Sequence, residues 1–167
     1  MLDIEFDLQD INILNIQKED EEIIQHWLYE QCEFYEGDIY PIEIDKLHDR
    51  FLEYYISENE FFVKIQHDGK LIGIIKGRIE FKNPTEAWVW CIMLDYRYRN
   101  LGIGSNIINE LNKYLIREYG VANLYTTIVE NPKTINFLKK NGYKIIRSSK
   151  NYYDINGKQM DMLILKK

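Results

Sequence analysis

The stretch Arg99-Asn100-Leu101-Gly102-Ile103-Gly104 decides the fold of this chain, because its two glycines separate two apolar segments of different period. The preceding segment, 87–94, is a bulky apolar run that predicts a buried strand. In the following segment, 105–116, apolar residues recur at helical spacing. A strand, a glycine loop and a helix start together favour phosphate binding, because the first turn of a helix leaves N–H groups unpaired.

Two common glycine loops are excluded by single positions in this stretch. A dinucleotide-binding fingerprint requires a third glycine where Ile107 stands, and a P-loop requires a lysine that Gly104-Ser105 lacks. What remains is the pattern Arg-x-x-Gly-x-Gly over residues 99–104. A plain strand-to-helix turn, or the turn of a different α/β phosphate-binding enzyme, is still an alternative at this point.

The composition predicts one globular domain spanning residues 1–167. No apolar run approaches the roughly 20 residues needed to cross a bilayer, and the first residues lack a secretory pattern, so we expect a cytoplasmic protein with no membrane partner. The net charge of −6 argues against nucleic-acid binding. Cys32 and Cys91 are too few for a disulfide scaffold, and the three histidines lack metal-ligand spacing, so no metal is expected.

Apolar periodicity and turn residues predict the element order β-α-α-β-β-β-α-β-α-β-β. Asp68-Gly69 and Asn156-Gly157 are typical of hairpin turns, and Asn131-Pro132 is typical of a helix start. The predicted elements are strand 11–16, helices 18–31 and 45–57, strands 61–66, 71–81 and 87–94, helix 105–116, strand 123–129, helix 132–140, and strands 143–153 and 158–166.

This order, together with Arg-x-x-Gly-x-Gly, resembles the GNAT acyltransferase superfamily over nearly the whole chain. A second segment is similar in part to the family's Asn-x-x-Ala-x-x-Phe-Tyr-x-x-x-Gly-Phe pattern; its matching positions are Asn131, Thr134, Phe137, Leu138, Gly142 and Tyr143. The resemblance implies an α/β (α+β) fold of the GNAT type. That fold has a mixed, mostly antiparallel sheet of about seven strands, four helices, and a splay between the fourth and fifth strands.

The resemblance also implies acetyl-CoA as the acyl donor. Its pantetheine arm would follow the end of the fourth strand, and its diphosphate would rest on main-chain N–H groups of the glycine loop. Asn131 and Phe137 of the second segment would contact the cofactor. The cofactor-binding residues implied in this way are Ile92, Met93, Leu94, Arg99, Asn100, Leu101, Gly102, Ile103, Gly104, Ser105, Asn131 and Phe137.

The implied reaction is direct attack of an amine on the thioester in a ternary complex. The backbone N–H of Leu94 would hold the developing oxyanion. Leu138 stands where many family members have a tyrosine that protonates the leaving thiolate. Because a thiol with a pKa of about 8.5 leaves tolerably without help, we expect a slower enzyme rather than an inactive one. Glu86 and Glu80 are the candidate bases, and water-mediated proton transfer is the alternative.

The expected acceptor is a primary amine of a small molecule, such as an aminoglycoside or a polyamine-like compound, or of a peptide. Segment 33–43 carries four acids and three aromatics, so Tyr35 and Glu36 would form an acceptor-binding lip; a solubilising loop is the alternative. Trp88 and Trp90 would wall the acceptor pocket or belong to the core. The alternative function is a non-catalytic acyl-CoA-binding regulatory module, and a monomer or homodimer is expected.

Overall fold

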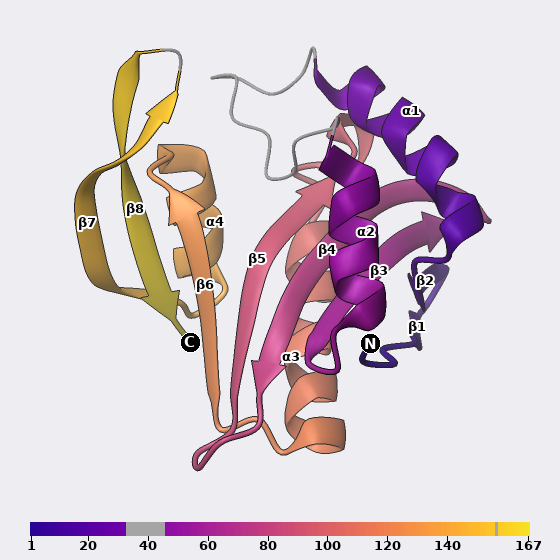
Figure 1. The fold of residues 1–167 in the computed structure, drawn as a ribbon, viewed down its shortest axis with the longest axis horizontal. Helices are drawn as coiled ribbons and strands as arrows, with labels where there is room; N and C mark the ends of the chain where they lie inside the picture. Colours follow the sequence, from indigo (N-terminus) through magenta and orange to yellow (C-terminus); the bar gives the residue numbers. More distant parts are fainter. Residues whose placement is uncertain (33–45, 156) are drawn as a thin grey trace. The chain divides into compact units, whose positions relative to one another are not determined.

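The computed structural model describes residues 1–32, 46–155 and 157–167 (Figure 1). In chain order the elements are β1 (Phe6–Leu8), β2 (Ile11–Asn15), η1 (Lys18–Asp20), α1 (Glu21–Cys32), α2 (Leu47–Ile56), β3 (Glu60–His67), β4 (Lys70–Glu80), β5 (Glu86–Leu94), η3 (Tyr96–Tyr98), α3 (Ile103–Tyr119), β6 (Asn123–Val129), α4 (Pro132–Lys140), β7 (Lys144–Ile155) and β8 (Lys158–Lys166).

Every predicted element is present, with ends that shift by at most three residues. The sheet has eight described strands rather than about seven, because β1 adds a strand that the sequence did not indicate. β1 has only three residues and pairs with β2 through a turn in which Gln9 has a φ of +55°. Such a short strand leaves too few positions for an alternating pattern to be recognised.

The strands follow one another in the sheet in the order β1-β2-β3-β4-β5-β6-β8-β7. β5 and β6 run parallel, whereas the pairs β1–β2, β2–β3, β3–β4, β6–β8 and β7–β8 are antiparallel. The sheet is therefore mixed and mostly antiparallel, as expected. The parallel pair β5–β6 requires a crossover, which α3 supplies.

The described chain divides into two compact units. The first unit comprises Met1–Arg78 and Cys91–Ile103, and the second comprises Ile79–Trp90 and Gly104–Lys167. A single-domain organisation over residues 1–167 stays a prediction.

The core of the first unit is formed where α1 and α2 cover the sheet (Figure 1). Trp27 and Leu28 from α1 and Phe51 from α2 belong to one apolar cluster with Phe62 of β3 and Met93 of β5. In both helices the buried residues lie three or four positions apart, which is the spacing that places side chains on one face. Burial of these side chains, at about 25 cal/mol per Å² of apolar surface, stabilises this unit.

The second unit buries one stripe of α3, which consists of Ile107, Ile108, Leu111 and Leu115. α3 ends where Gly120 adopts a φ of +63° and donates its backbone N–H to the carbonyl of residue 116. Even α3, the longest described helix, is not long and apolar enough to cross a membrane, and the same holds for the other described helices.

Candidate active site

The alternating side chains of β5 form one buried and one half-buried face. Trp90, Ile92 and Leu94 lie on the half-buried face. Cys91 and Met93 lie on the opposite face, inside the apolar cluster of the first unit. Because its side chain is buried, Met93 can offer only backbone groups to a ligand.

Asp95 directly follows β5 and is a fully buried carboxylate. Its Oδ2 accepts hydrogen bonds from Trp27 Nε1 (3.3 Å), Gln31 Nε2 (3.0 Å) and Arg97 Nη2 (2.6 Å), and its Oδ1 accepts from the backbone N and the Nε of Arg97. Burial acts to raise the pKa of Asp95, but the hydrogen bonds from Arg97 and Trp27 outweigh it and hold that pKa below its ordinary value. This network ties α1 to the segment that leaves β5.

The glycine loop continues from this segment. Arg99 turns back, and its Nε donates to the carbonyl oxygen of Leu94 at 2.8 Å, which fixes the loop to the last residue of β5. Asn100 and Gly102 have φ values of +62° and +81°, in the left-handed region. A Cβ at Gly102 would meet nothing within 4 Å, and α3 begins at the next residue. An exposed loop with open space at a helix start fits a diphosphate.

The parallel ladder between β5 and β6 is short. It runs from Glu86 paired with Asn123 to Val89 paired with Thr126, whereas β6 continues to pair with β8 as far as Val129. At the last pair, Thr126 Oγ1 donates a hydrogen bond to the Val89 carbonyl at 2.8 Å. The ladder between β5 and β6 therefore ends at Val89 and Thr126, and the parting of the two strands beyond this pair stays a prediction.

Asn131 caps α4 as predicted. Its side-chain oxygen accepts hydrogen bonds from the backbone N–H groups of Lys133 (2.9 Å) and Thr134 (3.2 Å). Phe137 is half-buried on the same helix. Ser105, in the first turn of α3, accepts a hydrogen bond from Asn141 Nδ2 at 3.1 Å. Contacts of these residues with a cofactor stay a prediction.

Trp88 is part of the packing of the second unit. Its ring stacks on Tyr125, its partner in the ladder, with ring centroids 4.6 Å apart. Its Nε1 is shielded from solvent and has no hydrogen-bond partner among the described residues. This arrangement favours the core interpretation for Trp88, so Trp90 is the better candidate for the acceptor wall.

Glu80 and Glu86, the two candidate bases, both contact Lys82. The Nζ of Lys82 lies 2.8 Å from a carboxylate oxygen of each, and the hydrogen bonds to Glu80 and Glu86 raise the pKa of Lys82 to about 12. Glu86 is the first residue of β5, and the end of the ladder at Val89 lies three residues, or about 10 Å, further along. The geometry gives both carboxylates an ion-pairing role, Glu80 at the end of β4 and Glu86 at the start of β5, and their role as bases stays a prediction.

We expect Glu86→Gln to change kcat by less than about twofold, because a group engaged by Lys82 at the far end of the ladder does not reach the reacting amine. Steady-state rates with acetyl-CoA and the preferred amine test this, with Lys82→Met as the matched variant for loss of the ion pair. A fall in kcat of about 100-fold in Glu86→Gln alone, at unchanged melting temperature, would restore Glu86 as the base.

Two further side chains, Leu138 and Cys91, are buried and cannot act as catalytic groups. Leu138 is buried in the second unit, and its aliphatic side chain has no proton to donate at this position. Burial raises the pKa of the Cys91 thiol to about 12, which keeps it protonated at neutral pH and excludes it as a nucleophile. Tyr35 and Glu36, expected at the acceptor lip, lie outside the described residues.

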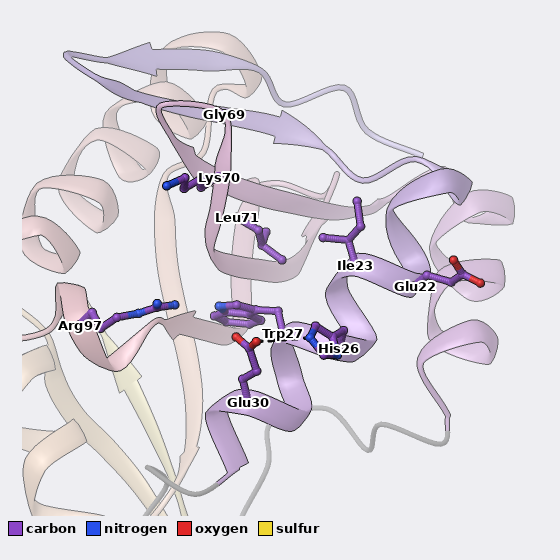
Figure 2. A pocket seen from close by; sticks show the side chains of 9 residues that line it. All are labelled: Glu22, Ile23, His26, Trp27, Glu30, Gly69, Lys70, Leu71 and Arg97. Atoms are coloured by element: carbon purple, nitrogen blue, oxygen red, sulfur yellow. Dashed lines mark ion pairs between the residues drawn. The ribbon is translucent and has the colours of Figure 1, made fainter.

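A shallow pocket of about 530 Å³ in the first unit was not foreseen from the sequence (Figure 2). Trp27 and Leu71 lie along its centre, Lys70 and Arg97 approach from one side, and Glu30 lies below (Figure 2). It is lined by Glu22, Ile23, His26, Trp27, Glu30, Gly69, Lys70, Leu71 and Arg97. Its walls come from α1, from the turn before β4 with the first residues of β4, and from η3, which are remote in sequence and share no local signal.

Comparison with known proteins agrees with this geometry. Residues 13–164 match the family model described as an acetyltransferase (GNAT) domain. An N-alpha-acetyltransferase from Sulfurisphaera tokodaii is 31% identical over 113 residues, which cover 62% of this chain and 68% of that protein.

Solved structures share the fold at lower identity. An acetyl transferase from Salmonella typhimurium, described as modifying the N-terminal serine of ribosomal protein L7/L12, superposes with a TM-score of 0.81 at 12% identity, covering 96% of this chain and 95% of that one. Spermidine N-acetyltransferase from Vibrio cholerae, in complex with CoA and spermine, gives a TM-score of 0.75 at 17% identity, with 96% of each chain covered. At these identities the likeness shows the fold.

Proposed function

This chain belongs to the GNAT acetyltransferase family and is an acyl-CoA-dependent N-acetyltransferase, and we propose that it acetylates the α-amine of a peptide or protein N-terminus. The observation that carries the choice of acceptor is the half-buried face of β5. Of the five residues on that face of the strand, only Glu86 is ionisable, and it is bound to Lys82 at the start of the ladder.

Among the residues that the structure describes on this face of β5, no carboxylate follows Glu86, and a strand without a base there favours an amine that is already partly neutral. At pH 7.5 an α-amine with a pKa of about 8 is about one-quarter neutral, whereas a lysine-type amine with a pKa of about 10.4 is about 0.1% neutral. An α-amine therefore needs only water to take its proton, and a polyamine or lysine needs a dedicated base. The similarity to an N-alpha-acetyltransferase supports the same choice.

The chain's own groups have distinct parts in this proposal. Backbone N–H groups from Asn100 to Ser105 bind the diphosphate of acetyl-CoA, whereas the Arg99 N–H, also expected there, already donates to the Tyr96 carbonyl at 3.3 Å. Backbone groups of Ile92 and Leu94 align the pantetheine arm as an added strand would be aligned. Arg99 holds the loop and the strand end together through the Leu94 carbonyl. Binding the thioester and the amine in one site removes most of the entropic barrier to their encounter.

The transfer forms a carbon–nitrogen bond and breaks the carbon–sulfur bond. The neutral amine attacks the thioester carbonyl, and the Leu94 N–H stabilises the oxyanion that develops. The attacking nitrogen, which becomes cationic, loses one proton to water, and CoA leaves as a thiolate that takes a proton from water, because Leu138 offers none. A thiol pKa of about 8.5 makes this unassisted departure cost only about 2 kcal/mol at neutral pH.

The proposal is tested by following thiol release from acetyl-CoA with a panel of four acceptors. The panel contains a lysine-free peptide with a free α-amine, an N-terminally blocked peptide with one lysine, spermidine, and an aminoglycoside. We expect kcat/KM for the free α-amine to exceed that for the blocked peptide by about 100-fold, in line with their neutral fractions. We also expect its pH profile to rise and level off near pH 8, and a preference for spermidine or the aminoglycoside contradicts the proposed acceptor.

A further inference from the structure

The first turn of α3 is joined to α4 and β8 by a chain of hydrogen bonds in the second unit. Lys167 Nζ donates to Asn109 Oδ1 at 2.7 Å, and Asn109 Nδ2 donates to Asn141 Oδ1 at 3.2 Å. Asn141 Nδ2 then donates to Ser105 Oγ at 3.1 Å. Asn141 is buried, although it directly follows α4. A buried amide whose nitrogen makes two hydrogen bonds and whose oxygen accepts one holds its orientation firmly.

The direction of these hydrogen bonds is fixed by two groups, of which one can only accept and the other can only donate. The Phe137 carbonyl can only accept, and Asn141 Nδ2 lies 2.8 Å from it, so the amide nitrogen of Asn141 must face both Phe137 and Ser105. The Lys167 ammonium can only donate, so the amide oxygen of Asn109 must face it. Each member therefore donates to the next, from Lys167 towards Ser105.

The last member of the chain is left with a hydrogen to give. Because Ser105 Oγ accepts from Asn141, its own hydrogen points elsewhere, and among residues 1–32, 46–155 and 157–167 no acceptor takes it. Ser105 is half-buried in the first helical turn, beside backbone N–H groups that lack intrahelical partners. A hydroxyl fixed as a donor at this position suits a phosphate oxygen, and a hydroxyl free to rotate suits it less.

We propose that Asn141 is a positioning residue for acetyl-CoA, which sets the Ser105 hydroxyl as a hydrogen-bond donor to the diphosphate. The inference rests on the proposed function, because it assumes that the loop before α3 binds CoA. It assigns a role in CoA binding to a residue outside that loop. It also fixes the direction of the hydrogen bond between the two residues: the side chain at position 141 must donate to Ser105. A hydrogen bond to a charged phosphate corresponds to about a tenfold change in affinity.

The test is a double-mutant cycle between positions 105 and 141, with CoA affinity measured by titration calorimetry. Ser105→Ala and Asn141→Ala should each weaken CoA binding about tenfold, and the double variant should be no weaker than either alone. Asn141→Asp, which accepts from Ser105 instead of donating, should weaken binding more than Asn141→Ala, and this excess should shrink once Ser105 is alanine. Additive losses, or an unchanged affinity in Ser105→Ala, overturn the inference.

Two further measurements separate positioning from folding. With S-acetylpantetheine, a thioester without the diphosphate, Asn141→Ala should keep the wild-type kcat/KM, whereas with acetyl-CoA the value should fall. Lys167→Met interrupts the chain at its exposed end and should weaken CoA binding about threefold, while Lys113→Met, which removes an equal charge from the exposed surface of α3, should not. Equal losses with both thioesters, or in both lysine variants, contradict a role for these hydrogen bonds in CoA binding. Wild-type protein that binds no CoA would instead refute the proposed function.

Discussion

Replacing Gly102 by valine is expected to lower the affinity for CoA by about 100-fold or more. The residue has a φ of +81°, a conformation that a β-branched residue strongly disfavours, and its backbone lies where the diphosphate is expected to approach. The open space beside it means that the added side chain meets no protein atom within 4 Å at its Cβ. The loss of affinity should therefore come from the shifted N–H groups and from the bulk placed in the path of the ligand.

Gly120→Val is the matched control for this variant. Gly120 follows the other end of α3, has a φ of +63°, and also has no neighbour within 4 Å of a Cβ. Both substitutions should lower the melting temperature to a similar extent, because both force a similar strain. CoA titration of the two folded variants then isolates the effect on the ligand. Equal CoA affinity in Gly102→Val and the wild type would show that the loop does not bind the diphosphate.

Replacing Asp95 by asparagine is expected to destabilise the first unit by about 3 kcal/mol. The carboxylate is fully buried and accepts from Trp27, Gln31 and Arg97, and an amide would direct its own N–H groups at these donors. Asp68→Asn applies the same chemical change to a side chain that is 79% exposed, and it should alter the stability by less than about 0.5 kcal/mol. Urea unfolding followed by tryptophan fluorescence measures both, because Trp27 is a direct partner of Asp95.

The pH dependence gives a second measurement of the same carboxylate. The folded-state pKa of Asp95 lies below its ordinary value of about 3.9, so the ionised form is favoured by folding. Its stabilisation is therefore fully present at neutral pH and is lost as the pH falls through the folded-state value. The stability difference between wild type and Asp95→Asn should be constant from pH 7 to about pH 5 and should shrink below about pH 4. A difference that grows on acidification contradicts the assigned network.

The parts of the fold that the sequence predicted well are those with local causes. The change from a continuous apolar strand to the helical spacing of Ile107, Leu111 and Leu115 located the loop before α3. Asn131 followed by Pro132 located the start of α4, because the cap and the first helical residue are adjacent in the chain. Each of these signals lies within a few residues of the feature that it predicts.

The parts that were missed depend on residues distant in sequence. Asp95 meets Gln31, 64 positions away, and Ser105 meets Asn141, 36 positions away, so neither contact leaves a local pattern. Glu80 and Glu86 were considered as bases because both are acids near the expected site, but Lys82 lies close enough in sequence to have suggested an ion pair. Sequence reasoning therefore located the loop before α3 and missed the contacts of Asp95 and Asn141 on either side of it.

The hydroxyl of Thr126 has a consequence for the end of the β5–β6 ladder. It donates to the carbonyl of Val89, the last β5 residue that pairs with β6, so a side chain satisfies this carbonyl without a further backbone partner. The β5–β6 ladder can therefore end at Val89 without leaving the carbonyl of its last residue unpaired.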